Sequence, residues 1–169
     1  MRRVVVVFVV ALSLFGCAAP DVDPASARVL AAAAIRVVHN DRPPGVHASF
    51  DEVVMLDHTD PLAGDGDGAG PERPWTRDER RSIETAVGGD VTWIPARPDV
   101  EALPVGEAVF SLGEPVVDGD DRLVPVLVWC GERCGIAYTY RFTPQVHGWE
   151  YAGLEGRVVE LPRAGTGAD

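Results

Sequence analysis

Apolar and polar residues alternate most regularly in the C-terminal half of the chain, where the pattern predicts an antiparallel meander. Residues 123–129 and 136–142 each show the period of two that a strand requires. The second segment places four large side chains on one face: Ile136, Tyr138, Tyr140 and Phe142. In the first segment apolar residues occupy both sets of alternating positions, so we expect both faces to be covered there.

Shorter apolar segments extend the meander on both sides. We expect strands at 108–112 and 149–152, and at 158–161 either a last strand or a segment packed along the sheet. A tight turn is expected at 118–121, whose Asp and Gly residues tolerate left-handed backbone. Pro125 lacks an amide donor, which predicts an edge position or a bulge at that point of its strand.

A helical period appears near the N-terminus. Apolar residues recur at a spacing of three or four from Leu30 to Val37 and give the segment one apolar face. Asp23 suits the cap of this helix and Pro24 its first position. We expect the helix to end near Asn40, because the prolines that follow cannot continue it.

A second helix is predicted from its end signals. Thr76 and Glu79 have the spacing of a capping box, and Gly88 suits the C-terminal end. Strands are expected before and after this helix, at 50–56 and 91–94. These signals place the second helix between two strands.

Taken together, the elements predict a single α+β domain over residues 24–163, with a frayed tail at 164–169. We expect an antiparallel sheet of four or five strands, mostly the C-terminal meander, with two helices packed on one face. Residues 57–74 are rich in Gly, Pro and Asp and predict a loop of unusual length, which is either mobile or functional.

Cys130 and Cys134 flank a three-residue connection between two predicted strands. Strand pairing around it would bring the two Cβ atoms within reach of a disulfide, which forms outside the cytoplasm. A catalytic dithiol, usually C-x-x-C at a helix start, and a zinc site, which needs four ligands, stay open as alternatives. The pattern C-G-x-x-C-G-x-x-Y-x-Y from Cys130, followed by Gly148-Trp149, resembles strands of uncharacterised bacterial envelope proteins, and this resemblance implies no activity.

Charge narrows the classes of partner. All 15 basic residues are Arg, against 26 acidic residues, and the formal net charge is −11. Non-specific nucleic-acid binding requires Arg or Lys to neutralise phosphates, so we expect no nucleic-acid partner.

The first residues predict an export signal. Arg2 and Arg3 form a positive n-region, an apolar h-region follows to Phe15, and small residues surround Cys17. The apolar run is shorter than the roughly 20 residues that a membrane span needs. One interpretation of this signal is an ordinary secretory signal peptide that is cut nearby, for example after Ala19; the other, lipidation of Cys17, follows from the residues before this cysteine.

Leu14-Phe15-Gly16-Cys17 resembles the lipobox of bacterial lipoproteins, although Phe15 stands where a smaller residue is usual. The resemblance implies that residues 1–16 are a signal peptide, that Cys17 is lipidated, and that 17–23 form a tether on the extracytoplasmic face of the cell membrane. Removal of the signal leaves 13 arginines against 26 acidic residues, a formal −13, so we expect the domain to stand off an anionic leaflet.

Motifs that carry chemistry are scarce. The sequence contains no G-x-S-x-G elbow, H-E-x-x-H helix, Walker loop or dinucleotide fingerprint, and we expect no cofactor. Four aspartates of the 57–74 loop lack the EF-hand spacing, so we also expect no metal: Asp57, Asp60, Asp65 and Asp67. His58, beside Asp57 and Asp60, is a candidate base. Tyr138, Tyr140 and Trp149 are a candidate ligand surface, with core packing as the alternative.

These observations favour a membrane-anchored, non-enzymatic lipoprotein that binds an envelope protein or a cell-wall component. The alternatives are an envelope hydrolase with its site near the 57–74 loop and a carrier that holds a small ligand on the concave side of the sheet. No pattern in the sequence separates the three.

Overall fold

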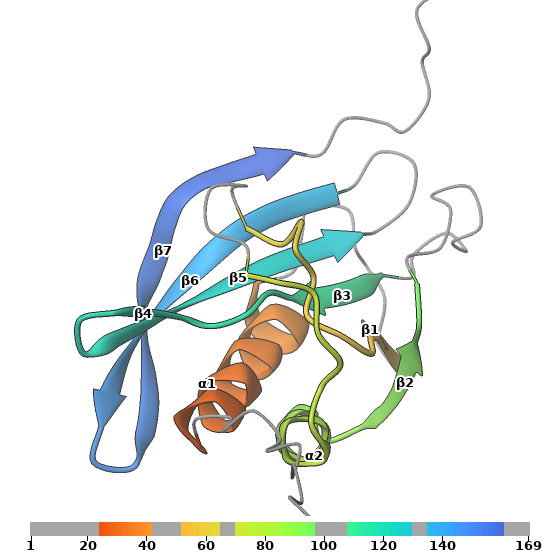
Figure 1. Ribbon diagram of the computed structural model, residues 1–169, viewed down its shortest axis with the longest axis horizontal. Helices are drawn as coiled ribbons and strands as arrows, with labels where there is room; N and C mark the ends of the chain where they lie inside the picture. The colour runs from red at the N-terminus through yellow and green to blue at the C-terminus, as the bar shows by residue number, and fades with distance from the viewer. Residues whose placement is uncertain (1–23, 42–51, 65–69, 97–107, 130–134, 161–169) are drawn as a thin grey trace, which may run out of the picture.

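The computed structural model describes residues 24–41, 52–64, 70–96, 108–129 and 135–160, and within them it is an α+β fold. Two α-helices accompany a mostly antiparallel sheet of seven strands (Figure 1). Cys17, Cys130, Cys134 and the tail at 164–169 lie outside the described residues, as does the tether.

The elements follow one another in this order: α1 (Pro24–Ile35), a short π-helix η1 (Arg36–Asn40), β1 (Glu52–Leu56), α2 (Arg77–Val87), β2 (Asp90–Ile94), β3 (Val109–Leu112), β4 (Val116–Asp118), β5 (Asp121–Trp129), β6 (Gly135–Gln145) and β7 (Gly148–Glu160).

The strands lie in the order β2-β1-β3-β5-β6-β7, and β4 pairs with β5 beside β3. β1 pairs parallel with both β2 and β3, whereas the ladders from β3 to β7 are antiparallel. The expectation of four or five strands was too low. The C-terminal meander continues into β1 and β2 through parallel pairings between distant segments, and three-residue β4 lies in what the pattern predicted as a connection.

α1 lies across the concave side of the curved sheet, where it contacts β3, β5 and β7 (Figure 1). α2 packs against α1. The face predicted for β6 is confirmed, because Tyr138, Tyr140 and Phe142 join Leu30 of α1 in the main core and Ile136 packs against it. A smaller cluster of Ala63, Leu127 and Ala137 covers the opposite face, so this part of the sheet is buried on both sides.

The helix ends follow local chemistry. In α2 the hydroxyl of Thr76 accepts from the amide of Glu79 at 3.2 Å, and the Glu79 carboxylate accepts from the amide of Thr76 at 2.8 Å. Gly88 ends the helix at φ 72°, a left-handed conformation that glycine adopts without strain. Both ends of α2 and the start of α1 at Pro24 confirm the sequence prediction.

Pro125 lies inside the sheet rather than at its edge. It pairs with Thr139 of β6, and on its other side it faces the interruption between β3 and β4. Its carbonyl accepts from the amide of Gly113 at 2.8 Å. The nitrogen and the carbonyl of a strand residue point to the same side of the strand. The Pro125 nitrogen, which has no hydrogen to donate, therefore faces the interruption, where no residue of β3 or β4 is paired with Pro125.

β7 is one long strand that includes both the short strand expected at 149–152 and most of the segment 158–161, for which a last strand was one of two alternatives. Its ladder with β6 changes register twice, between Ala137 and Thr139 and between Arg141 and Phe142. Gly153 and Gly156 have φ of 143° and 70°, which lets the chain pass through these irregularities without ending the strand.

We predict that Gly113→Ala destabilises the fold by about 1–3 kcal/mol, because an added Cβ would come within 2.8 Å of the Pro125 ring. The matched control is Gly89→Ala, where a Cβ meets nothing within 4 Å. Neither glycine has a positive φ, so the pair isolates the steric effect. Urea unfolding should show a lower midpoint only for Gly113→Ala; equal midpoints for both variants would contradict the prediction.

Candidate functional site

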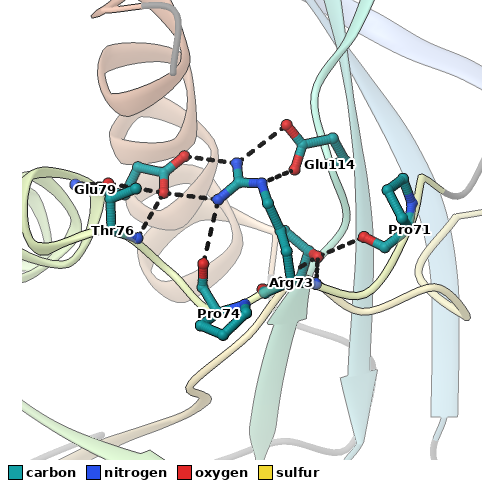
Figure 2. A network of polar contacts seen from close by, with 7 residues as sticks. Pro71, Arg73, Pro74, Thr76, Glu79 and Glu114 are labelled. Atoms are coloured by element: carbon teal, nitrogen blue, oxygen red, sulfur yellow. Dashed lines mark hydrogen bonds and ion pairs between the residues drawn. The ribbon is translucent and has the colours of Figure 1, made fainter. Parts of the chain in front are cut away.

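Arg73 is the centre of a network of charges at the end of the 57–74 loop (Figure 2). Its two terminal nitrogens donate to the two carboxylate oxygens of Glu79 at 2.8 and 2.9 Å, a bidentate pair. Its Nε lies 2.6 Å from Glu114, and one terminal nitrogen also donates to Glu114 at 3.0 Å. One guanidinium therefore joins α2 to the segment that follows β3.

Glu79 is fully buried at the start of α2. Burial alone would raise the pKa of this carboxyl, but hydrogen bonds from Arg73 and Thr76 outweigh it and hold the pKa below the ordinary value. The hydrogen bond to Glu79 in turn raises the pKa of Arg73. Both groups stay charged because the guanidinium donates hydrogen bonds to the carboxylate and each charge stabilises the other.

Backbone bonds around Thr59 complete the closure of the loop. The hydroxyl of Thr59 donates to the carbonyl of Pro71 and accepts from the amide of Arg73, each at 2.8 Å, and the Trp75 indole donates to the carbonyl of Leu56 at 2.9 Å. The network is a structural clamp: its polar atoms are bonded to one another and hold the loop, α2 and the β3–β4 connection together.

His58 lies at the surface side of this clamp. Its Nδ1 is 3.0 Å from Asp57, and its Nε2 is 4.0 Å from Glu72. A carboxylate beside one ring nitrogen is how a general base is oriented. Here, however, a second carboxylate faces the other nitrogen, and Asp57 is also 3.7 Å from Arg80. This arrangement is a small group of polar contacts among Asp57, His58, Glu72 and Arg80.

Asp60, which the sequence places close to His58, is bonded within its own turn. The carboxylate of Asp60 accepts from the amide of Leu62 at 2.9 Å, and Asp60 is only 1% exposed. Asp65 and Asp67 lie outside the described residues. Among the residues that the structure describes, no three His, Cys, Asp or Glu side chains are grouped as metal ligands.

The candidate ligand surface of Tyr138, Tyr140 and Trp149 divides into two places. Tyr138 and Tyr140 are 6% and 0% exposed, and their hydroxyls are 3.3 Å apart in the core. Burial raises the pKa of Tyr138 to about 12. These two side chains are core residues and present no surface. Trp149 is half-buried at the other end of the hairpin that β6 and β7 form.

A cavity of about 580 Å³ lies beside Trp149. The start of α1 contributes one wall and the β6–β7 turn the other, and the lining residues are Ala25, Arg28, Pro144, Gln145, Val146, His147, Gly148 and Trp149. Figure 1 shows these two elements side by side at the lower left. The guanidinium of Arg122 lies over the Trp149 ring, 5.4 Å from its centroid. The cavity thus combines an aromatic face with two arginines and a histidine at its border.

Sequence reasoning missed Arg28, Arg73 and Arg122. Arg28 stands on the predicted helix, but its proximity to the hairpin depends on how α1 crosses the sheet. Arg73 was part of a loop without a local pattern, although its partner Glu79 was found through the capping box. Arg122 lies near Trp149 because β5 and β7 both pair with β6, where Arg122 is opposite Phe142 and Trp149 is opposite Pro144.

Comparison with protein-family models, with curated proteins and with solved structures found no match for this chain. Within the described ranges, neither helix has the length and apolar character needed to cross a bilayer.

We predict that Arg73→Met costs about 3–5 kcal/mol of unfolding free energy near neutral pH, because it leaves the buried Glu79 carboxylate without its partner. The control is Arg80→Met, whose ion pair at 3.7 Å is partly exposed and should cost about 0–1 kcal/mol. Urea denaturation of the two variants measures the difference, and similar costs would contradict the clamp.

The pH dependence of stability should differ as well. In the native chain the lowered pKa of Glu79 gives stability that is present above the ordinary value of 4.5 and is lost as pH falls through the folded pKa. In Arg73→Met the burial that remains should raise this pKa, so protonation relieves the penalty. The deficit of Arg73→Met relative to the native chain should therefore shrink between pH 7 and pH 4; a constant deficit would count against this account.

Proposed function

We propose that the chain is an extracytoplasmic lipoprotein, anchored to the cell membrane through an acylated Cys17, whose domain acts by binding rather than by catalysis. The n-region, the h-region and the lipobox resemblance of residues 14–17 support the anchor. The start of α1 at Pro24 is consistent with a tether at 17–23. An envelope protein or a cell-wall component is the expected partner.

The observation that favours binding is the contrast between the clamp and the cavity. The buried carboxylate of Glu79 and the half-buried guanidinium of Arg73 are bonded to each other and join separate segments of the fold. The cavity at the β6–β7 turn instead has Arg28, His147 and Trp149 at an accessible surface, a mixture of aromatic and polar groups typical of binding sites.

The alternative of an envelope hydrolase rests on the contact of His58 with Asp57. It requires the imidazole to act as a base. The third candidate, a carrier of a small ligand, would need space on the concave side of the sheet, which α1 occupies (Figure 1). We therefore place the carrier behind the other two.

We also propose that Cys130 and Cys134 form a disulfide. Trp129 and Gly135, the residues that flank the pair, are directly opposed in the β5–β6 ladder. An antiparallel ladder extended by one position would oppose residues 130 and 134, and this register supports the pairing. The bond would fix the register at this end of the hairpin.

We expect the intact mass of the mature protein, isolated from its native membrane, to begin at Cys17 and to include acyl chains. Alkylation of thiols should add no mass to residues 130 and 134 before reduction and two groups after it. An unacylated mass that starts beyond Cys17 would refute the anchor, and free thiols without reduction would reopen the redox and metal alternatives.

The enzyme alternative predicts that His58→Gln, with or without Asp60→Asn, abolishes the cellular phenotype that the native gene confers, although the domain of the variant stays folded. The binding proposal predicts that His58→Gln retains the phenotype. Circular dichroism and thermal unfolding of the same variants serve as the folding control. Loss of the phenotype in a folded His58→Gln variant would favour the hydrolase.

A further inference from the structure

Six residues gather where the β6–β7 turn lies beside the start of α1, and we call them the hairpin surface. They are Arg28, Val117, Arg122, Val146, His147 and Trp149. Arg28, Val146, His147 and Trp149 line the cavity. The surface therefore includes residues from α1, β4, β5 and the β6–β7 hairpin.

Strand register joins the remaining two residues to the cavity. Val117 of β4 is directly opposite Arg122 of β5, so the two side chains lie on the same face of the sheet. The guanidinium of Arg122 extends over Trp149, which lines the cavity. Val117, Arg122 and Trp149 consequently form one continuous strip.

The apolar members of the hairpin surface are unusually exposed. Val146 at the tip of the turn is 92% exposed, and Val117 is 64% exposed. Trp149 is half-buried between Arg122 and the cavity. Exposed apolar side chains beside a tryptophan and basic residues are the composition of segments that lie in a membrane–water interface.

The charge of this surface is opposite to that of the whole chain. Arg28 and His147 line the cavity, Arg122 borders it, and none of the eight lining residues is acidic. The complete sequence has a net charge of −11. At the cavity and over Trp149 a negative group therefore meets positive side chains, although the exposed Asp120 and Glu150 adjoin this surface in the chain.

The hairpin surface also lies at the end of the domain that an anchor would hold close to the bilayer. Ala25, the second residue of α1, lines the cavity. Pro24 is seven positions after the proposed lipidated Cys17, a separation that spans at most about 25 Å when the chain is fully extended. This step rests on the proposed function.

We propose that the hairpin surface docks onto anionic phospholipid headgroups of the bilayer that holds the anchor. Arg28 and Arg122 contact the phosphates, and Val146 and Trp149 enter the interface. This proposal replaces the expectation, drawn from net charge alone, that the domain stands off the leaflet. Local charge decides the orientation because surface electrostatics fall off within about one Debye length, on the order of 10 Å.

The test uses the mature protein, reconstituted in phosphatidylcholine vesicles with or without phosphatidylglycerol, with brominated acyl chains as quenchers of tryptophan fluorescence. We expect quenching that depends on phosphatidylglycerol and is lost in Trp149→Phe. Arg28→Ala combined with Arg122→Ala should lower the ratio of docked to undocked protein by about 25-fold, at about fivefold per arginine. The matched control is Arg77→Ala with Arg157→Ala, two exposed arginines outside the hairpin surface, which should change the ratio little.

Equal quenching of the native chain and Trp149→Phe, or equal effects of the two double variants, would overturn the proposal. A response of Trp149 to inorganic phosphate without quenching by vesicles would identify a soluble anion as the occupant and would also overturn it. Flotation and intact mass report the anchor separately. If the isolated protein proves unacylated, the same vesicles still test the surface, and binding without dependence on phosphatidylglycerol would refute it.

Discussion

Glu79 is a fully buried carboxylate that must stay ionised to keep Arg73 in place, and Arg73 in turn is what makes its burial tolerable. This reciprocity fixes three segments that have little else in common: the end of a long loop, the first turn of α2, and the chain that leaves β3. The parallel strands β1 and β2 flank α2 in the sequence, so the clamp fixes one point of the connection between them. A hydrophobic contact would fix the relative positions of these segments less strictly, because it does not depend on a particular distance and angle between its partners.

Local signals in the sequence were sufficient for the elements whose stability is local. The capping box at Thr76, the left-handed Gly88 and the alternation from Ile136 to Phe142 all describe chemistry within a few residues, and the structure contains each of them. The pairing of β1 with β3 leaves no such signal, because parallel ladders join segments that are far apart in the chain. The same distinction holds within the clamp. Glu79 could be identified from the capping box that it forms with nearby Thr76, whereas Glu114 contacts Arg73 from a distant part of the sequence.

The candidate sites illustrate a related limit. The alternation that found Tyr138 and Tyr140 could show that they share a face but not that α1 covers that face. Trp149 was identified with them, yet its surroundings come from the β6–β7 turn and α1. Net charge has a similar limit, because a sum over 169 residues does not show that two arginines and a histidine lie together at one end of the domain. Spatial arrangement, rather than composition, decides which partner such a molecule attracts.

β7 ends the sheet on one side, and in the described part of the chain it pairs with β6 alone. A strand of 13 residues with Leu154 and Val158 about half exposed would ordinarily invite another chain to add to the sheet. The two register shifts and the glycines at 153 and 156 bend this edge, so that a straight strand cannot follow it over its full length. The irregularity that interrupts the alternating pattern of β7 in the sequence thus also makes this edge a poor template for a further strand.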